Sequence, residues 1–264
     1  MRIMASAPAK VILFGEHFVV YGVPALVAAI ELRARAFASK RPDGLVRISA
    51  PDLGAAGLFS REGFEPEVGG VGAEEVLKPI FRAVEAIREV FSSDTGVDLE
   101  VRSDIPVAAG LGSSAAVAVS SSAALCYLLR GSVDKELVFK AALEAEKIVH
   151  VTPSGVDPAI STYGGLVIYR RGEGVREIEL RRPLELVIGD TGLKRSTGAL
   201  VSAVRALRDR RPKLFEKLLV SAEELVSEAV EALREGDLMA LGELMNVNHG
   251  LLSAIGVSNE ALDR

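Results

Sequence analysis

Alternating apolar and charged residues mark a strand near the middle of the chain. Val97, Leu99 and Val101 alternate with charged side chains over residues 97–102, which is the period of a half-buried strand. Residues 115–129 follow as a run of small and apolar residues without Gly or Pro, and such a run favours a helix. The pattern therefore predicts a strand, a glycine-rich turn and a helix, in that order.

The same reasoning predicts an α+β fold of two lobes, with residues 1–183 in the first and residues 184–264 in the second. Strands are expected at residues 2–7, 10–14, 24–30, 34–39, 163–169, 175–181 and 184–190, with Pro8 separating the first two. Helices are expected at residues 73–91, 134–149, 198–209, 212–234 and 237–252, and another is expected to start with Ser258 as its N-cap. Residues 41–72 are rich in glycine and are expected to be mostly loop.

The glycine-rich turn between the central strand and helix is a candidate phosphate site. Gly110 and Gly112 allow a tight turn and a close approach to a ligand. Ser113 and Ser114 lie where the first helical N–H groups are free and the helix dipole is positive, a place that suits phosphate. An ordinary glycine turn with a serine N-cap would give the same short pattern.

Two other phosphate-binding motifs compete for this turn. Gly110, Gly112 and Ala115 fit the spacing of a dinucleotide fingerprint, and an NAD-type oxidoreductase would follow from it. That motif needs an acid at the end of a second strand about 20 residues later, and the nearest acid, Asp134, starts another helix instead. A P-loop would need a Gly-Lys-Ser/Thr sequence, and the turn contains no lysine.

Composition narrows the class of protein without fixing its function. The chain has 264 residues, of which 49% are hydrophobic and 25% charged, with a net charge of −5. These values are typical of a globular protein and argue against general nucleic-acid binding. Cys126 is the one cysteine, so no internal disulfide forms. The sequence shows no signal peptide and no run long enough to span a bilayer, so we expect a cytoplasmic protein without membrane partners.

Several polar residues lie beside buried segments and are candidates for chemistry. Lys10 lies in an apolar strand, where a lysine needs a partner, and Glu16 and His17 form a charged pair between two apolar stretches. Asp157 follows turn signals and is expected on an irregular segment, where a turn-capping role is as reasonable as a catalytic one. Thr197 precedes a predicted helix and would also serve as its N-cap.

Four separated segments together resemble the mevalonate kinases of the galactokinase, homoserine kinase, mevalonate kinase and phosphomevalonate kinase superfamily. They are Pro8-Ala9-Lys10 through Gly15-Glu16-His17 to Tyr21-Gly22, Pro106 to Ala116, Glu146 to Asp157, and Lys194-Arg195-Ser196-Thr197. Galactokinases carry an aspartate after the Gly-Glu-His sequence, and homoserine kinases lack the Glu-His. One departure is that the superfamily's third, glycine-rich motif is absent before Arg264.

The resemblance implies that ATP transfers its γ-phosphoryl group to the primary hydroxyl of mevalonate, a step of isoprenoid biosynthesis, in a cleft between the two lobes. It implies that Asp157 and Lys10 are catalytic, that Ser114 and Glu146 bind the Mg²⁺ that accompanies ATP, and that Glu16, His17 and Thr197 contact mevalonate. Whether Asp157 acts as a base or orients the hydroxyl stays open. The nucleotide would be held by Pro106, Gly110, Leu111, Gly112, Ser113, Ser114 and Ala115.

Three alternatives remain at this point: another kinase of the superfamily such as a phosphomevalonate or sugar kinase, a non-catalytic ligand-binding relative, and the dinucleotide oxidoreductase. The last three expected helices carry apolar faces that only two expected strands could cover, so we expect the second lobe to be incomplete and the natural protein to continue beyond Arg264. A homodimer is left open.

Overall fold

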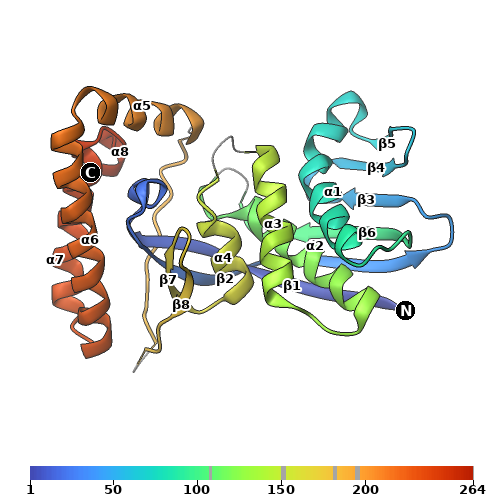
Figure 1. Ribbon diagram of the computed structural model, residues 1–264, viewed down its shortest axis with the longest axis horizontal. Coiled ribbons are helices and arrows are strands. Elements are labelled where there is room, and N and C mark those ends of the chain that lie inside the picture. The colour runs from blue at the N-terminus through green and yellow to red at the C-terminus, as the bar shows by residue number, and fades with distance from the viewer. Residues whose placement is uncertain (107–108, 150–152, 181–182, 194–196, 264) are drawn as a thin grey trace. The chain divides into compact units, whose positions relative to one another are not determined.

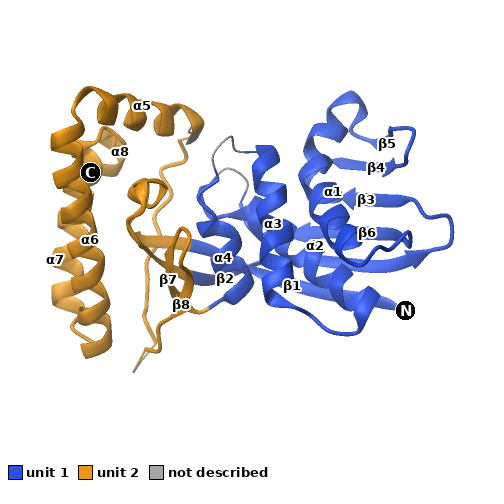
Figure 2. Cartoon of the chain, in the orientation of Figure 1, with its two compact units in different colours: residues 1–10, 29–164 blue, residues 11–28, 165–264 orange. Residues whose placement is uncertain are grey.

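The computed structural model describes residues 1–106, 109–149, 153–180, 183–193 and 197–263 (Figure 1). The chain forms two compact units (Figure 2). Unit 1 comprises residues 1–10 and 29–164, and unit 2 comprises residues 11–28 and 165–264. Strands β1 (Arg2–Phe14) and β2 (Ala25–Arg41) contribute to both units, so each unit is discontinuous in the sequence.

Unit 1 is built on a mixed sheet in the order β5-β4-β3-β6-β2. Its further strands are β3 (Val46–Ala50), β4 (Ala55–Phe59), β5 (Phe64–Val68) and β6 (Gly96–Ser103). β6 runs antiparallel to β2 and parallel to β3, and β1 pairs with β2. The alternation of the central strand is confirmed, because Val97, Leu99 and Val101 are all buried in the core of this unit.

Helices α1 (Ala73–Val90), α2 (Ser113–Arg130) and α3 (Lys135–Val149) pack on this sheet and on one another. Each contributes to one apolar cluster with the strands, through Leu77 of α1, Leu125 of α2 and Ala141 of α3. The short helix α4 (Val156–Tyr163) packs against α2 and α3. Two 3₁₀ helices, η2 (Pro51–Leu53) and η3 (Gly70–Gly72), complete the unit.

Unit 2 combines a small sheet with long helices. β7 (Leu166–Arg170) pairs with the first residues of β2 and with β8 (Gly174–Glu177). The helices are α5 (Thr197–Arg210), α6 (Pro212–Glu235), α7 (Leu238–Ala254), α8 (Glu260–Asp263) and the 3₁₀ helix η1 (Phe18–Tyr21). One apolar cluster joins the small sheet to α6 and α7, and a second joins η1 to α5, α6 and the end of α7. Within the part of the chain that the structure describes, every helix is too short or too polar to cross a membrane.

The α+β class and the expected long helices are confirmed, and the strand predictions need four corrections. The strands expected at residues 24–30 and 34–39 are one continuous strand, β2. Pro8 does not divide the first strand, since β1 runs from Arg2 to Phe14. β1 pairs with β2 alone among the described strands, and an edge strand tolerates proline. Residues 41–72 form β3, β4 and β5 rather than loop. Residues 184–190 form no strand: Leu184 and Leu186 pack on the core of unit 2 without a strand partner among the described residues.

The division of the chain also differs from the expected boundary at residue 183. Residues 165–180 belong to unit 2 because β7 and β8 pair with the beginning of β2 and share its apolar cluster. The cap of the last helix differs as well. Asn259, not Ser258, accepts the N–H groups of Ala261 and Leu262 at the start of α8.

Candidate active site

A buried lysine and an aspartate form the centre of the candidate site in unit 1. Lys10 lies on β1 with only 10% of its side chain exposed, and its Nζ is 3.2 Å from Oδ1 of Asp157. A buried lysine is stable only with a partner, and Asp157 supplies that partner. The Asp157 side chain keeps 29% of its surface exposed, so the carboxylate can still reach a ligand.

Asp157 lies in the first turn of α4, not on the irregular segment that we expected. Gly155 precedes the helix in the left-handed conformation, at φ 83°, and Pro158 follows Asp157 in the first turn. Proline fits the first turn of a helix, and an acidic side chain there interacts favourably with the helix dipole. The turn signals in the sequence therefore mark the beginning of a helix, and that helix fixes the aspartate.

The glycine loop lies directly against this pair. The Lys10 N–H donates to the carbonyl oxygen of Leu111 at 3.0 Å, which ties the loop to β1. Gly112 precedes α2 in the left-handed conformation, at φ 75°. A Cβ atom on Gly112 would lie 2.8 Å from Cγ of Lys10 and 3.5 Å from Oδ2 of Asp157. A residue without a side chain therefore allows the loop to pass this close to Lys10, while the distance to Asp157 is that of an ordinary contact.

The loop leads into a helix end that suits an anion. Ser113, Ser114 and Ala115 are the first residues of α2. No side chain of the described residues caps the helix, and its first turn holds no acidic residue. Their N–H groups lack helical partners, and the dipole favours negative charge. Pro106 and Gly110 lie exposed on the same loop. Val107 and Ala108 lie outside the described residues.

Glu146 brings a second acid to the site from α3. Its Oε2 atom is buried and has no hydrogen-bond partner among the residues that the structure describes. Burial first, and the charge of Asp157 second, raise the Glu146 pKa to about 8, against the lowering effects of Lys10 and of the Gly155 N–H. A buried carboxylate oxygen without a donor fits a hard cation. The described residues hold no cluster of three or more His, Cys, Asp or Glu groups, so other oxygens would have to complete such a site.

The predicted residues Glu16 and His17 lie in unit 2, in the turn between β1 and η1. His17 has a φ of 62°, a conformation that non-glycine residues rarely adopt. Asn248 of α7 donates from Nδ2 to Oε1 and Oε2 of Glu16, at 3.2 and 3.3 Å. Sequence reasoning missed Asn248. The feature that could have indicated Asn248 is the presence of a polar residue within the apolar stripe of a predicted helix.

The remaining predicted residues are placed in part. Thr197 is the first residue of α5, which agrees with a helix start there, but its side chain is not described. Lys194, Arg195 and Ser196 of the same predicted segment lie outside the described residues, as do His150, Val151 and Thr152.

The position of Asp134 decides against a dinucleotide fold. Its Oδ1 atom accepts the N–H groups of Glu136 and Leu137, at 2.9 and 3.1 Å, and so caps the start of α3. A dinucleotide site would need this acid at the end of a strand, facing a ribose. The glycine turn therefore lacks the partner that the oxidoreductase alternative requires.

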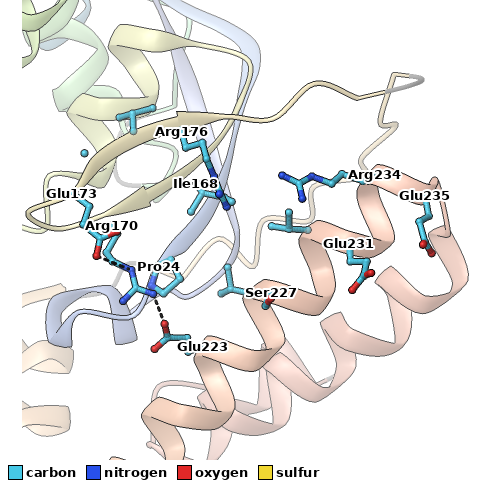
Figure 3. Close-up of a pocket in the computed structure, with 14 residues that line it drawn as sticks. Pro24, Ile168, Arg170, Glu173, Arg176, Glu223, Ser227, Glu231, Arg234 and Glu235 are labelled. Atoms are coloured by element: carbon cyan, nitrogen blue, oxygen red, sulfur yellow. Dashed lines mark hydrogen bonds and ion pairs between the residues drawn. The ribbon is translucent and has the colours of Figure 1, made fainter.

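Unit 2 also contains a cavity of about 690 Å³ between the β7–β8 hairpin and α6 (Figure 3). Arg170 of β7 pairs with Glu223 of α6, and its Nε lies 3.7 Å from Glu173. None of the predicted site residues lines this cavity. The chemistry expected from the sequence is therefore assigned to the Lys10–Asp157 pair with its glycine loop and to the Glu16–His17 turn, and not to this cavity.

Comparison with known proteins identifies relatives along almost the whole chain. Residues 78–165 match the model of the GHMP kinases N terminal domain. A mevalonate kinase of Pyrococcus abyssi is 42% identical, over 98% of this chain and 79% of the relative. A mevalonate kinase of Thermococcus onnurineus is 41% identical, over 99% and 80%. The crystal structure of L. major mevalonate kinase in complex with R-mevalonate matches with a TM-score of 0.79 and 31% identity, covering 98% of this chain and 78% of that one.

Proposed function

The chain belongs to the mevalonate kinase family, and on that premise we propose that it transfers the γ-phosphoryl group of ATP to the primary hydroxyl of mevalonate, a step of the mevalonate pathway to isoprenoids. The observation that carries the proposal is the Lys10–Asp157 pair beneath Gly112, at the free N-terminus of α2. The N-terminus of α2, which can bind an anion, and the Asp157 carboxylate, which Lys10 holds in position, thus belong to one site. Both substrates are charged, water-soluble molecules, so the proposal includes a cytoplasmic enzyme.

Phosphoryl transfer depends mainly on positioning and on neutralising charge. In our proposal the N–H groups at the start of α2, together with Gly110 and Gly112, hold the β- and γ-phosphates. The Lys10 ammonium neutralises charge on the transferred group. Asp157 holds the mevalonate hydroxyl and either accepts its proton or orients it toward the phosphorus. The short Lys10–Asp157 contact supports these separate roles of the two side chains, since it fixes the position of both before a substrate binds.

We also propose that the nucleotide binds with Mg²⁺. The buried, unpartnered Oε2 of Glu146 and the hydroxyl of Ser114, in the first turn of α2, would hold the ion together with phosphate oxygens and water. The ion would neutralise charge on the β- and γ-phosphates. Ser114 of α2 and Glu146 of α3 could contribute to one ion site because the two helices pack against each other.

On the mevalonate side we propose contacts from Glu16, His17 and Thr197. Glu16 is held by Asn248, and His17 follows it in a conformation that the turn imposes. A histidine and a carboxylate can bind the hydroxyl and carboxylate groups of a small hydroxy acid through hydrogen bonds. Thr197 stands at the start of α5, where helical N–H groups could accompany its hydroxyl.

An assay of ADP release tests this function directly. The purified chain is given MgATP with mevalonate, phosphomevalonate, homoserine or galactose, and Asp157→Asn serves as the inactive control. We expect turnover with mevalonate and none above background with the other three. Turnover of phosphomevalonate or galactose instead would assign the chain to another activity of the superfamily. Nucleotide binding without turnover of any acceptor would favour a non-catalytic relative.

A further inference from the structure

Helix α7 carries one polar residue in its otherwise apolar buried face. Leu241, Leu244, Asn248, Leu251 and Ile255 follow one another at spacings of three or four residues, so they share one face of the helix. The apolar members join the two cores of unit 2. Asn248 is only 5% exposed, and burying an amide is costly unless it is hydrogen-bonded.

The partner of this amide is the Glu16 carboxylate. Nδ2 of Asn248 lies 3.2 Å from Oε1 and 3.3 Å from Oε2, although the two residues are 232 positions apart in the sequence. The carboxylate can only accept, which fixes the Asn248 amide with its nitrogen toward Glu16. The contact holds the end of the Glu16 side chain from the centre of a long helix.

The backbone on either side of Glu16 is also tightly fixed. Gly15 has a φ of 87°, and a Cβ atom there would lie 2.2 Å from the carbonyl oxygen of Pro24. His17 adopts a φ of 62°. Directly after it, Phe18 is fully buried against Phe215 of α6. A strained residue persists only where its surroundings determine its conformation, and the Asn248 contact is part of those surroundings.

We propose that Asn248 is a positioning residue for the mevalonate side of the site: through Glu16 it holds the Glu16–His17 turn in the conformation that contacts the substrate. This inference rests on the proposed function for the identity of the substrate. It predicts that loss of the amide affects mevalonate more than ATP, because Asn248 is hydrogen-bonded to Glu16 within unit 2, whereas the proposed nucleotide residues belong to unit 1.

The test compares Asn248→Leu with Asn246→Leu. Both replace an asparagine of α7, but Asn246 is exposed, whereas Asn248 is buried. Leucine at position 248 continues the apolar face, so the variant should fold, and Asn248→Ser serves as a second variant of smaller volume. For both Asn248 variants we expect the KM for mevalonate to rise by about 10-fold to 100-fold, the effect of losing a hydrogen bond to a charged group. The KM for ATP should stay within about twofold, and Asn246→Leu should match the wild type in both.

A readout without turnover separates this inference from the proposed function. The imidazole signals of the free protein are recorded by proton NMR, and the His17 signal is identified by its loss in His17→Gln. We expect Asn248→Leu to shift the His17 signal and Asn246→Leu to leave it in place. An unmoved His17 signal, or an equal rise of KM for ATP and mevalonate, would overturn the positioning role. A wild-type protein that does not phosphorylate mevalonate would overturn the proposed function, while the NMR comparison would still decide the role of Asn248.

Discussion

Gly112 and Lys10 are so close that a methyl group on the glycine would lie 2.8 Å from Cγ of the lysine. The two residues are 102 positions apart, and the contact joins the glycine loop to the strand that carries the lysine. The structure gives a specific reason for a glycine at position 112, since a side chain there would collide with the side chain of Lys10, whose Nζ pairs with Asp157.

This contact makes Gly112→Ala far more damaging than Gly110→Ala. Both glycines have a φ of 75°, but a Cβ atom on Gly110 would meet no atom of the described residues within 4 Å. The two variants therefore share the strain of a left-handed alanine, roughly 1–2 kcal/mol, and differ in the collision with Lys10. We expect kcat to fall at least tenfold further in Gly112→Ala, as measured in the ADP-release assay on folded protein. Equal kcat values in the two variants would show that the collision is relieved without cost.

Asp157→Asn should lower kcat by about 10²–10⁴-fold, the usual contribution of a general base. Its effect on thermal unfolding should be limited, because asparagine also fits the first turn of α4 and its amide oxygen can still accept a hydrogen bond from the Lys10 ammonium, although the charge that pairs with the lysine is lost. Asp134→Asn is the matched control, since it alters an aspartate at the start of α3 whose capping an asparagine oxygen can reproduce. If Asp157→Asn retains more than about a tenth of the wild-type kcat, Asp157 orients the hydroxyl and does not act as the base.

Glu146 gives a prediction about stability against pH. Its pKa is near 8 in the folded protein and near the ordinary 4.5 in the unfolded chain. Between these values the folded state holds a proton that the unfolded state has lost, so stability falls as the pH rises from 4.5 to 8. Each pKa unit corresponds to about 1.4 kcal/mol. Without metal or nucleotide, Glu146→Gln should therefore flatten this decline and unfold at a higher temperature than the wild type at pH 9.

The control for this measurement is Glu144→Gln, on the same helix and paired with Lys147 at the surface. It should keep the wild-type pH dependence. In assays with MgATP, Glu146→Gln should be the impaired protein. It should need more Mg²⁺ than the wild type for half-maximal activity, whereas its KM for mevalonate should change little. The same half-saturating Mg²⁺ concentration in wild type and Glu146→Gln would exclude Glu146 as a ligand of the ion.

The sequence was informative where local patterns and burial agree. The alternation at Val97 and Leu99 predicted a strand because one face of β6 is buried. The alanine-rich run predicted α2 because no residue in it disrupts a helix. The strand break predicted at Pro8 was wrong. The effect of a proline on a strand depends on whether a neighbouring strand needs a backbone N–H at that position, which is a property of the sheet and not of the local sequence. The strand predicted at residues 184–190 was wrong because their apolar side chains pack on the core of unit 2 without a strand partner among the described residues.

The site could be predicted in its residues but not in its contacts. Motif resemblance selected Lys10 and Asp157, and it could not say that Gly112 touches both. Asn248 was missed because its partner, Glu16, lies 232 positions away. A single asparagine in an apolar helix face indicates that a partner exists, and only the folded chain shows which one.

The glycine before Glu16 allows the last prediction, which concerns stability. A Cβ atom on Gly15 would lie 2.2 Å from the carbonyl oxygen of Pro24 and 2.9 Å from Cα of Ala25, both of which are backbone atoms. Gly22, at the other end of η1, has a similar φ of 96°, and no atom of the described part of the chain would lie within 4 Å of a Cβ atom there. Alanine at either position incurs the left-handed strain, but only at position 15 must the backbone move apart.

Gly15→Ala should therefore lower the free energy of unfolding by about 1–3 kcal/mol more than Gly22→Ala, the usual cost of overpacking a core site. Urea denaturation of both variants measures the difference. Because the crowded atoms lie where β2 begins, we expect the loss to be accompanied by faster hydrogen exchange at Ala25 and Leu26, which pair with β7. Equal unfolding free energies would mean that the turn can shift away from Pro24, and the rigid Glu16–His17 geometry on which the role of Asn248 depends would then lose its support.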